Sequence, residues 1–494
     1  MTAIPGSIRV TGMIAPSDST DVYATHDSKY EKGGFKEVQD YTERDGISND
    51  RRSEGMLVYV NATKEYFILK NNIFTLLSFN AGTSLGLPLP SMRMNDYNHE
   101  NFLAYLAPIH KENINILPTI NAFSHLISPT PVARKYNAMI YSPSQDSIHL
   151  LPEVAYSSWE CINCSTGLIV SYPHKITCGT NYYVGGVFTP TLNRIYLVPG
   201  LIGNVDWHYI DCNYNVTTYA FATSPVKSYS HTGITITTSD IAYSGGVYSP
   251  KQDKIYFMPA DQARFSTWHY IDCIDGTVHE YNNPFTFDYH AYNGGIYSPT
   301  NDRIYLLPDA ISSSPTWHYI DCATGTVVAY DHLADILPRS SAYNGGAYSP
   351  TENKIYLAPC RLSDESIWHF IDCENSTLVG YTGDANCVDQ GYAGAVYSPT
   401  VNRIYFTPYN QASSTTPNRV LHYIDCNTGR LLSYLNTING NNQWYKGGIY
   451  SPNQNRVYFT PYLAAANLKW HYIQEQSIAC IAPAVAAYPM FNKS

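Results

Sequence analysis

Residues 291–330 contain the sequence Ala291-Tyr-Asn-Gly-Gly-Ile-Tyr-Ser-Pro-Thr-Asn-Asp-Arg-Ile-Tyr-Leu-Leu-Pro308, a spacer, and then Trp317-His-Tyr-Ile-Asp-Cys-Ala-Thr-Gly-Thr-Val-Val-Ala-Tyr330. The chain carries seven copies of this unit. Each copy has a proline after Ser or Thr, and intervals of 47 to 60 residues separate these prolines: Pro143, Pro190, Pro250, Pro299, Pro350, Pro399 and Pro452. A period of about 50 residues built from short strand-like runs is typical of a β-propeller.

One unit divides into four strand-like runs that are separated by turn signals. Residues 294–298 form the first, and their two glycines permit a close backbone approach near the propeller axis. Asp302 follows Pro299 by three residues, and Asn or Asp recurs at this position because both tolerate the left-handed conformation of a tight hairpin. The remaining runs are rich in Tyr, Ile and Val, so each unit predicts one blade of four antiparallel strands.

The number of blades depends on a weak extra copy. Residues 104–118 repeat the first hairpin in degenerate form, and Pro108 and Pro118 match the two prolines of the unit. Only 35 residues separate Pro108 from Pro143, which is too few for a full blade. The hairpin either completes the last blade or forms part of an eighth. We therefore predict an all-β chain with a seven-bladed propeller at residues 102–483, eight blades as the alternative, and a tail at residues 484–494.

Composition excludes several classes of protein. The formal net charge is −10 and no basic stripe is present, so we expect no nucleic-acid partner. No run of 18 apolar residues exists, so we expect no membrane span. The first residues lack the regions of a signal peptide, so export by a standard signal is not expected. Nothing in the sequence calls for a cofactor.

Six of the eleven cysteines occupy one equivalent site in successive units: Cys164, Cys212, Cys273, Cys322, Cys373 and Cys426. Packed sheets lie about 10 Å apart, whereas a disulfide requires Cα atoms within about 7 Å. These residues are therefore expected to be small buried thiols of a protein made in a reducing compartment.

A histidine starts the third strand of six units: His208, His269, His318, His369, His422 and His471. On separate blades these residues stand too far apart to share a metal ion, so packing is the better interpretation. An aspartate ends the same strand at Asp211, Asp272, Asp321, Asp372 and Asp425, where we expect its carboxylate to bond the backbone of the next turn.

Seven tyrosines enter the innermost strands and are the candidate ligand-binding residues: Tyr136, Tyr183, Tyr243, Tyr292, Tyr343, Tyr392 and Tyr445. An aromatic ring of this kind can stack sugars or side chains, and the alternative is packing between blades. The loops between second and third strands vary freely and offer a recognition face. They are residues 200–206, 260–267, 309–316, 360–367, 409–420 and 462–469. No catalytic or zinc-binding motif appears, so no enzyme is predicted.

Residues 1–70 lie outside the repeat and predict a small β-rich module. Residues 44–52 suit a turn or short helical segment, and residues 56–60 and 65–69 suit a hairpin. Such a short hairpin needs a partner surface. Residues 71–101 have turn and extended character and suit a linker.

Two motifs of the module carry a resemblance: Arg44-Asp-x-Ile47 and Arg51-Arg-x-x-Gly-Met-x-Val-Tyr-Val60, which follow Ile14-Ala-Pro and Tyr30-x-Lys-Gly-Gly-Phe35. Residues 8–70 resemble an N-terminal module of bacteriophage and related viral structural proteins, although Gly46 and Ser48 replace the expected Ala and Pro. The resemblance implies a docking or oligomerising segment at the start of a fibre or appendage. The candidate docking residues are Arg44, Asp45, Arg51, Arg52, Gly55, Met56 and Tyr59.

The resemblance implies a virion structural protein that is made in the host cytoplasm. Its module would bind other virion proteins, and its propeller would be displayed for host attachment, through a surface protein or glycan, or for capsid or tail decoration. One alternative is an internal connector of tail, neck or vertex, and another is a glycan-binding or glycan-active propeller. Anchors of this kind are often multimeric, which allows a homo-oligomer, although no coiled-coil heptads support one.

Overall fold

The computed structural model describes residues 35–76 and 118–475, apart from residues 64, 71, 125–134, 154–157, 175, 177–182, 201–206, 215–223, 232–233, 235–240, 288–289, 334–337, 363–365, 385–386, 413–419, 439–442 and 464–468. The chain divides into two compact units, Met1–Asn115 and Ile116–Ser494. The predicted tail at 484–494, and the predicted linker from residue 77 onward, lie outside the described residues.

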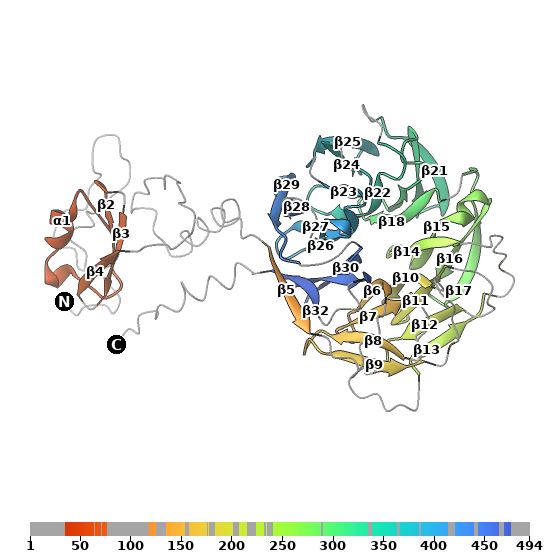
Figure 1. Ribbon diagram of the computed structural model, residues 1–494, viewed down its shortest axis with the longest axis horizontal. Helices are drawn as coiled ribbons and strands as arrows, with labels where there is room; N and C mark the ends of the chain where they lie inside the picture. The colour runs from red at the N-terminus through yellow and green to blue at the C-terminus, as the bar shows by residue number, and fades with distance from the viewer. Residues whose placement is uncertain are drawn as a thin grey trace, which may run out of the picture. The chain divides into compact units, whose positions relative to one another are not determined.

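The second unit is a seven-bladed β-propeller made of four-stranded antiparallel sheets (Figure 1). Blade 1 consists of β6 (Tyr136–Ser142), β7 (Ser147–Pro152), β8 (Ser158–Asn163) and β9 (Ile169–Pro173). Blade 2 consists of β10 (Tyr183–Thr189), β11 (Arg194–Pro199), β12 (Trp207–Asp211) and β13 (Val226–Tyr229). Blade 3 consists of β14 (Tyr243–Ser249), β15 (Lys254–Pro259), β16 (Thr267–Asp272) and β17 (Thr277–Asn282). Blade 4 consists of β18 (Tyr292–Ser298), β19 (Arg303–Pro308), β20 (Thr316–Asp321) and β21 (Thr326–Asp331). Blade 5 consists of β22 (Tyr343–Ser349), β23 (Lys354–Pro359), β24 (Ile367–Asp372) and β25 (Thr377–Thr382). Blade 6 consists of β26 (Tyr392–Ser398), β27 (Arg403–Pro408), β28 (Val420–Asp425) and β29 (Arg430–Leu435).

Blade 7 closes the ring with strands from both ends of the propeller sequence. It combines β30 (Tyr445–Ser451), β31 (Arg456–Pro461) and β32 (Lys469–Gln474) with β5 (Thr119–Ser124), which pairs with β32 so that Phe123 faces Trp470. The prediction of seven blades is confirmed, and the alternative of eight is wrong because β5 supplies the outer strand of the seventh. The predicted hairpin before β5 lies outside the described residues, except for Pro118.

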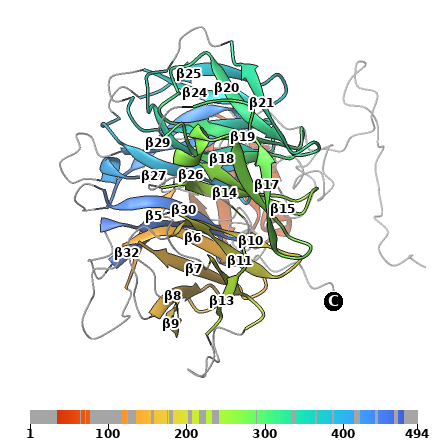
Figure 2. The ribbon, with the colours of Figure 1, turned by 90° about the vertical axis from the view of Figure 1, so that its right-hand side faces the viewer.

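The first strand of each blade contacts the first strands of both neighbours, so these seven strands surround the axis (Figures 1 and 2). Glycine is required where they approach most closely. Gly345 has φ of +89°, and a Cβ atom there would lie 2.9 Å from the Cα atom of Gly394 in the next blade. The glycines therefore have the role near the axis that the sequence predicts.

The hairpin between the first two strands has the same locked geometry in every blade. The predicted Asn or Asp has φ between 47° and 55° at Asp146, Asn193, Asp253, Asp302, Asn353, Asn402 and Asn455, which confirms the prediction. The carbonyl of this residue accepts the N–H of the residue after the third strand, as Asn353 accepts from Cys373 at 3.0 Å. In six blades its side chain also accepts a tyrosine hydroxyl, as Asp302 accepts from Tyr297 at 2.9 Å.

The six repeat cysteines are buried, as predicted, and they are free thiols in the structure. Burial raises the pKa of Cys373 to about 12, and Ser298 of the preceding blade opposes the rise. Blade 7 has Glu475 at the equivalent position, and its carboxylate accepts a hydrogen bond from Ser398 of blade 6. Burial raises the pKa of Glu475 to about 6, although Ser398, Tyr405 and Arg403 favour the ionised form.

We predict that Glu475→Gln stabilises the protein at neutral and alkaline pH. The folded pKa of about 6 lies above the ordinary value of 4.5, so the folded state prefers the protonated carboxyl. Stability from this group is present below the ordinary pKa and is lost as pH rises through the folded pKa, by up to about 2 kcal/mol.

The measurement is urea unfolding of both proteins across this pH window. The difference in the free energy of unfolding between Glu475→Gln and the unaltered protein should grow as pH rises from the ordinary pKa to the folded pKa. The same difference for Glu374→Gln, on an exposed turn, should not change with pH. A flat difference for the Glu475 variant would contradict the assignment.

The first unit contains a small mixed sheet with strand order β1 (Phe35–Val38), β2 (Leu57–Val60), β3 (Glu65–Lys70) and β4 (Ile73–Leu76). The predicted hairpin is β2 and β3, and β1 flanks it in parallel and β4 in antiparallel orientation. The predicted helical segment is α1 (Tyr41–Asp45) with the 3-10 turn η2 (Asn49–Arg51). The sheet continues to Leu76, so the predicted end of the module at residue 70 and start of the linker at residue 71 fall inside it.

The helices among the described residues are short. Two further 3-10 turns, η4 (Asp261–Arg264) and η5 (Asn410–Ala412), lie between second and third strands of the propeller. Within the described part of the chain, no helix has both the length and the hydropathy that crossing a membrane requires.

Candidate functional site

The seven predicted tyrosines lie together at one end of the inner strands, but their rings are at most 2% exposed. In six blades the tyrosine hydroxyl bonds Nδ1 of the repeat histidine in the same blade, as Tyr292 bonds His318 at 2.8 Å. In blade 1, Tyr136 bonds the carboxylate of Glu160, which replaces the histidine, at 3.1 Å. The structure therefore places these tyrosines in blade packing rather than on an open platform for a ligand.

Burial fixes the protonation states that this bond needs. It lowers the pKa of His318 to about 4, so the imidazole is neutral and one of its two ring nitrogens is free to accept a hydrogen bond. Burial also raises the pKa of Tyr292 well above its ordinary value, so the hydroxyl stays protonated. The repeat histidines pack as predicted, and the described residues include no group of three or more His, Cys, Asp or Glu that could hold a metal ion.

We predict that Tyr343→Phe lowers the free energy of unfolding by about 1–3 kcal/mol, because it removes a buried hydrogen bond to His369. Tyr409→Phe is the control, since its hydroxyl lies on a half-buried ring outside this pairing. Equilibrium unfolding in urea measures both changes. Equal losses in the two variants would contradict a stabilising role for the Tyr343–His369 bond.

The repeat aspartates bond the turn that follows them, as predicted. Asp372 accepts the N–H of Glu374, two residues later, at 2.9 Å, and Asp211, Asp272 and Asp425 accept the equivalent N–H. Asp321 accepts the N–H of Thr324, three residues later. These carboxylates are thus committed to the fold. The recurring Tyr, His and Asp side chains form the hydrogen bonds that hold the blades together. A functional site is therefore to be sought where a blade departs from the repeat.

One departure lies at the tyrosine end, which we define by the residues that follow the inner-strand tyrosines and the second-strand prolines. The register places Tyr445 opposite Pro461, so Lys446 and Tyr462 lie at this end of blade 7. Lys446 donates to the Oδ1 atom of Asn137 in blade 1 at 3.3 Å, and its amine lies 5.5 Å from the Tyr462 ring centroid. The other six residues after the tyrosines are uncharged: Asn137, Val184, Ser244, Asn293, Asn344 and Ala393.

Charges and aromatic rings continue around Lys446. Tyr462 donates to Glu153 at 3.0 Å, and Lys135 lies 3.8 Å from Glu153 and 5.1 Å from the Tyr462 ring. Desolvation lowers the pKa of Lys446, and Glu153 opposes this shift. Burial and Glu153 raise the pKa of Tyr462 to about 12. This cluster joins blades 7 and 1 and places lysine ammonium groups beside one aromatic ring, that of Tyr462.

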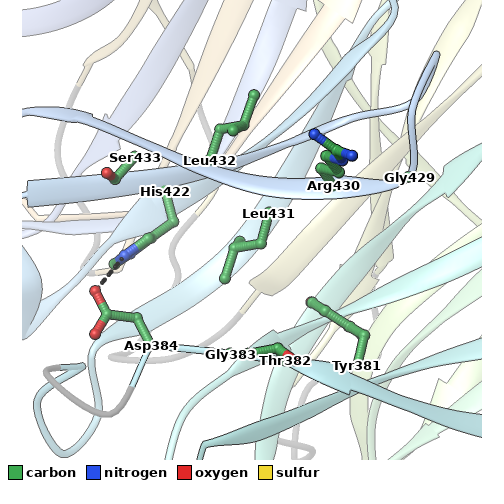
Figure 3. Close-up of a pocket in the computed structure, with 10 residues that line it drawn as sticks. All are labelled: Tyr381, Thr382, Gly383, Asp384, His422, Gly429, Arg430, Leu431, Leu432 and Ser433. Carbon is green, nitrogen blue, oxygen red and sulfur yellow. Dashed lines mark hydrogen bonds and ion pairs between the residues drawn. The ribbon is translucent and has the colours of Figure 1, made fainter.

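A second departure is a pocket of about 450 Å³ between the outer strands of blades 5 and 6 (Figure 3). Tyr381 to Asp384 form one wall, and the other wall comes from β29 and the residue that precedes it, with His422 behind. At the inner end, Nε2 of His422 bonds the Oδ2 atom of Asp384 at 2.9 Å, and Nδ1 bonds Tyr392 at 2.5 Å. Burial lowers the pKa of His422 although Asp384 raises it.

One residue of the pocket wall, Gly383, departs from the repeat. The second residue after the outer-strand tyrosine is a ring or an amide elsewhere, at His174, His231, Asn283, His332 and Asn436, but it is Gly383 in blade 5. In blade 2 this residue stacks on the repeat tryptophan, with ring centroids of His231 and Trp207 4.2 Å apart. At Gly383 a Cβ atom would lie 2.4 Å from Trp368, so the backbone itself closes against the indole.

Two of the candidate docking residues hold the first unit together. The Arg44 guanidinium lies 4.3 Å from the Phe67 ring centroid and 4.7 Å from that of Tyr41. Arg52 donates to the carbonyls of Ile47 and Asp45, at 2.9 Å each. The two arginines of the motif therefore hold residues 44–52 against the sheet.

The remaining docking candidates differ in exposure. Met56 is buried in the core of the unit, and Gly55 has φ of +81° in the turn before β2. Asp45 is exposed beside Arg44, and Arg51 is partly exposed. Tyr59 is partly exposed and packs on Tyr66, with centroids 4.7 Å apart. Met56 is thus the candidate that is closed to a docking partner, whereas Asp45 and Gly55 are exposed and the others are partly exposed.

We predict that Arg52→Ala raises amide hydrogen exchange in residues 44–56 and leaves exchange in the propeller unchanged, because it frees two carbonyls that hold this segment. Lys70→Ala, at the exposed end of β3, is the control and should leave the segment protected. Mass spectrometry of the whole chain reads out both units. Unchanged exchange in residues 44–56 would contradict the structural role of Arg52.

Comparisons with known proteins give a likeness of fold. No family model matches the chain, and neither does any curated protein sequence. A chain in the crystal structure of the mitotic checkpoint complex is 10% identical with a TM-score of 0.47, and the match covers 81% of this chain and 100% of that one. The propeller domain of Myceliophteria thermophila Cps50 (Swd1) is 9% identical with a TM-score of 0.45, covering 72% and 100%.

A third solved structure is PorZ, a bacterial surface component of the type-IX secretion system of Porphyromonas gingivalis. It is 7% identical with a TM-score of 0.42, and the match covers 69% of this chain and 37% of that chain. At these identities the likeness carries nothing about function. The class of the protein is nevertheless defined by its own strand pairing: a seven-bladed β-propeller preceded by a small mixed sheet.

Proposed function

We propose that the protein is a virion structural protein that uses its propeller for host attachment or for decoration of the capsid or tail. The observation that carries the proposal is the motif set of residues 8–70, which resembles the start of viral fibre proteins. A non-catalytic role suits the propeller, because its recurrent Tyr, His, Asp and Cys side chains are bound within the blades.

Recognition is expected at the tyrosine end. The register of Tyr292 with Pro308 brings the start of each blade and the loop after its second strand to one end of the ring. These loops vary in sequence on a rigid scaffold, which is how binding faces are commonly built. The cluster around Lys446 and Tyr462 adds a cation and half-buried rings at the same end. A host-surface protein or glycan is the proposed partner, with other virion proteins bound by the first unit.

The second candidate is an internal connector of tail, neck or vertex. The same tyrosine end would then bind only virion proteins, and no host ligand would exist. A glycan-binding role outside a virion is the third candidate, and the pocket of blades 5 and 6 favours it over a glycan-active enzyme, because its carboxylate at Asp384 is bonded to a histidine rather than paired with a second carboxylate.

The test is mass spectrometry and gold labelling of purified virus particles from the source. An epitope tag in the exposed turn at Ile274 lies at the opposite end of blade 3 from Tyr243, so labelling leaves the tyrosine end untouched. We expect the chain in particles, with tagged turns at a fixed surface position. A label reached only in disrupted particles would favour the connector, and absence from particles would overturn the virion role.

A further inference from the structure

We propose that the pocket between β25 and β29 binds a neutral saccharide unit through the Asp384 carboxylate and the Ser433 hydroxyl. The proposal rests on the proposed function only for its biological meaning, as a glycan receptor site on the propeller. Binding itself is a property of this chain and is tested on the protein alone. The pocket volume of about 450 Å³ lies within the usual range for small-ligand sites, about 300–1,000 Å³.

The polar end of the pocket is held in place before any ligand arrives. Tyr392 is fully buried, and its hydroxyl fixes Nδ1 of His422, whose ring is 2% exposed. Nε2 of that ring then bonds Asp384, whose side chain is 26% exposed. A carboxylate oriented in this way is a ready acceptor for the paired hydroxyls of a sugar, and pre-organised groups cost little to order on binding.

The side wall of the pocket alternates with the period of the strand. Ser433 lies directly opposite His422 in the pairing of β28 with β29, so its hydroxyl is on the His422 side of the sheet. Leu431 lies on the same side and points toward the Gly383 wall, whereas Arg430 and Leu432 point to the other side of β29 (Figure 3). Leu431 and the Tyr381 ring offer apolar surface for the C–H face of a sugar.

Charge decides between classes of sugar. Two charged residues line the pocket: Asp384 points to its His422 end, whereas the Arg430 guanidinium is drawn on the other side of β29 (Figure 3). A carboxylate repels an acidic sugar and leaves a neutral one unaffected. An amino sugar would be attracted through its ammonium group instead. The comparison of glucose, glucuronate and glucosamine therefore separates three recognition modes on one scaffold.

The test is saturation-transfer NMR of the full chain with the methyl glycosides of glucose, galactose, mannose and N-acetylglucosamine, together with glucuronate and glucosamine. We expect at least one neutral sugar to bind at millimolar concentration and glucuronate to bind about tenfold more weakly. No transfer to any neutral sugar overturns the proposal. Transfer to glucosamine alone also overturns it, because the pocket would then recognise a cation.

Ser433→Trp fills the pocket and should weaken binding at least about tenfold. Ser228→Trp is the matched control, because Ser228 is also exposed and lies opposite His208 in blade 2 as Ser433 lies opposite His422 in blade 6. Asp384→Asn should weaken binding while thermal unfolding stays that of a folded propeller. Equal binding by the two tryptophan variants overturns the site. Saccharide binding by a protein that is absent from virus particles would leave this inference standing and remove the virion role.

Discussion

The bond between the inner-strand tyrosine and the third-strand histidine is the constraint on which the ring depends. It joins the first and third strands of a blade across the second, at the end where the loops emerge. Both partners are buried, and burial gives each the protonation state that the bond requires, a neutral imidazole and an intact phenol. The opposite end of the same blade is held by the left-handed Asn or Asp, whose carbonyl accepts the N–H after the third strand. Each blade is thus fixed at both ends by groups that have little freedom to do anything else.

Local chemistry made much of this predictable. The left-handed position three residues after each proline follows from the tolerance of Asn and Asp, and the aspartate at the end of the third strand follows from the N–H groups of the next turn. The seven equivalent tyrosines were identified from the sequence, which left a ligand platform and blade packing both open, and their burial favours packing. A recurring aromatic residue has the same pattern whether its ring packs or is exposed, and only the partner at His318 or its equivalents decides. Arg44 and Arg52 were predicted as docking residues for the same reason. Their motif shows that the residues are needed, but it does not show which groups they contact.

The pocket had a signal in the sequence, but it was an absence. Alignment of the outer-strand tyrosines shows His or Asn two residues later in five blades and glycine in blade 5. That glycine does not by itself predict a pocket, because its backbone closes on Trp368. The opening also requires Asp384 to reach His422 in the next blade, which is a contact over 38 residues of sequence. Closure of the last blade by an N-terminal segment was one of two alternatives that the degenerate repeat at residues 104–118 left open, and the strand that pairs with β32 is β5, directly after that repeat.

A residue that departs from the repeat can have a structural reason or a functional one. The departures at Glu475, at Lys446 and at Gly383 with Asp384 differ in this respect. Glu475 replaces a cysteine in the blade that β5 completes, where the first and last strands of the propeller pair and the usual Asp-Cys ending of the third strand is lost. Lys446 bonds Asn137 across the junction of blades 7 and 1, so closure of the ring gives it a structural reason as well. Gly383 and Asp384 lie between blades 5 and 6, where the repeat is continuous. The strands that close the ring are not at this position. Ring closure therefore does not account for Gly383 and Asp384. The carboxylate that His422 orients in the pocket is the observation on which the proposed saccharide site rests.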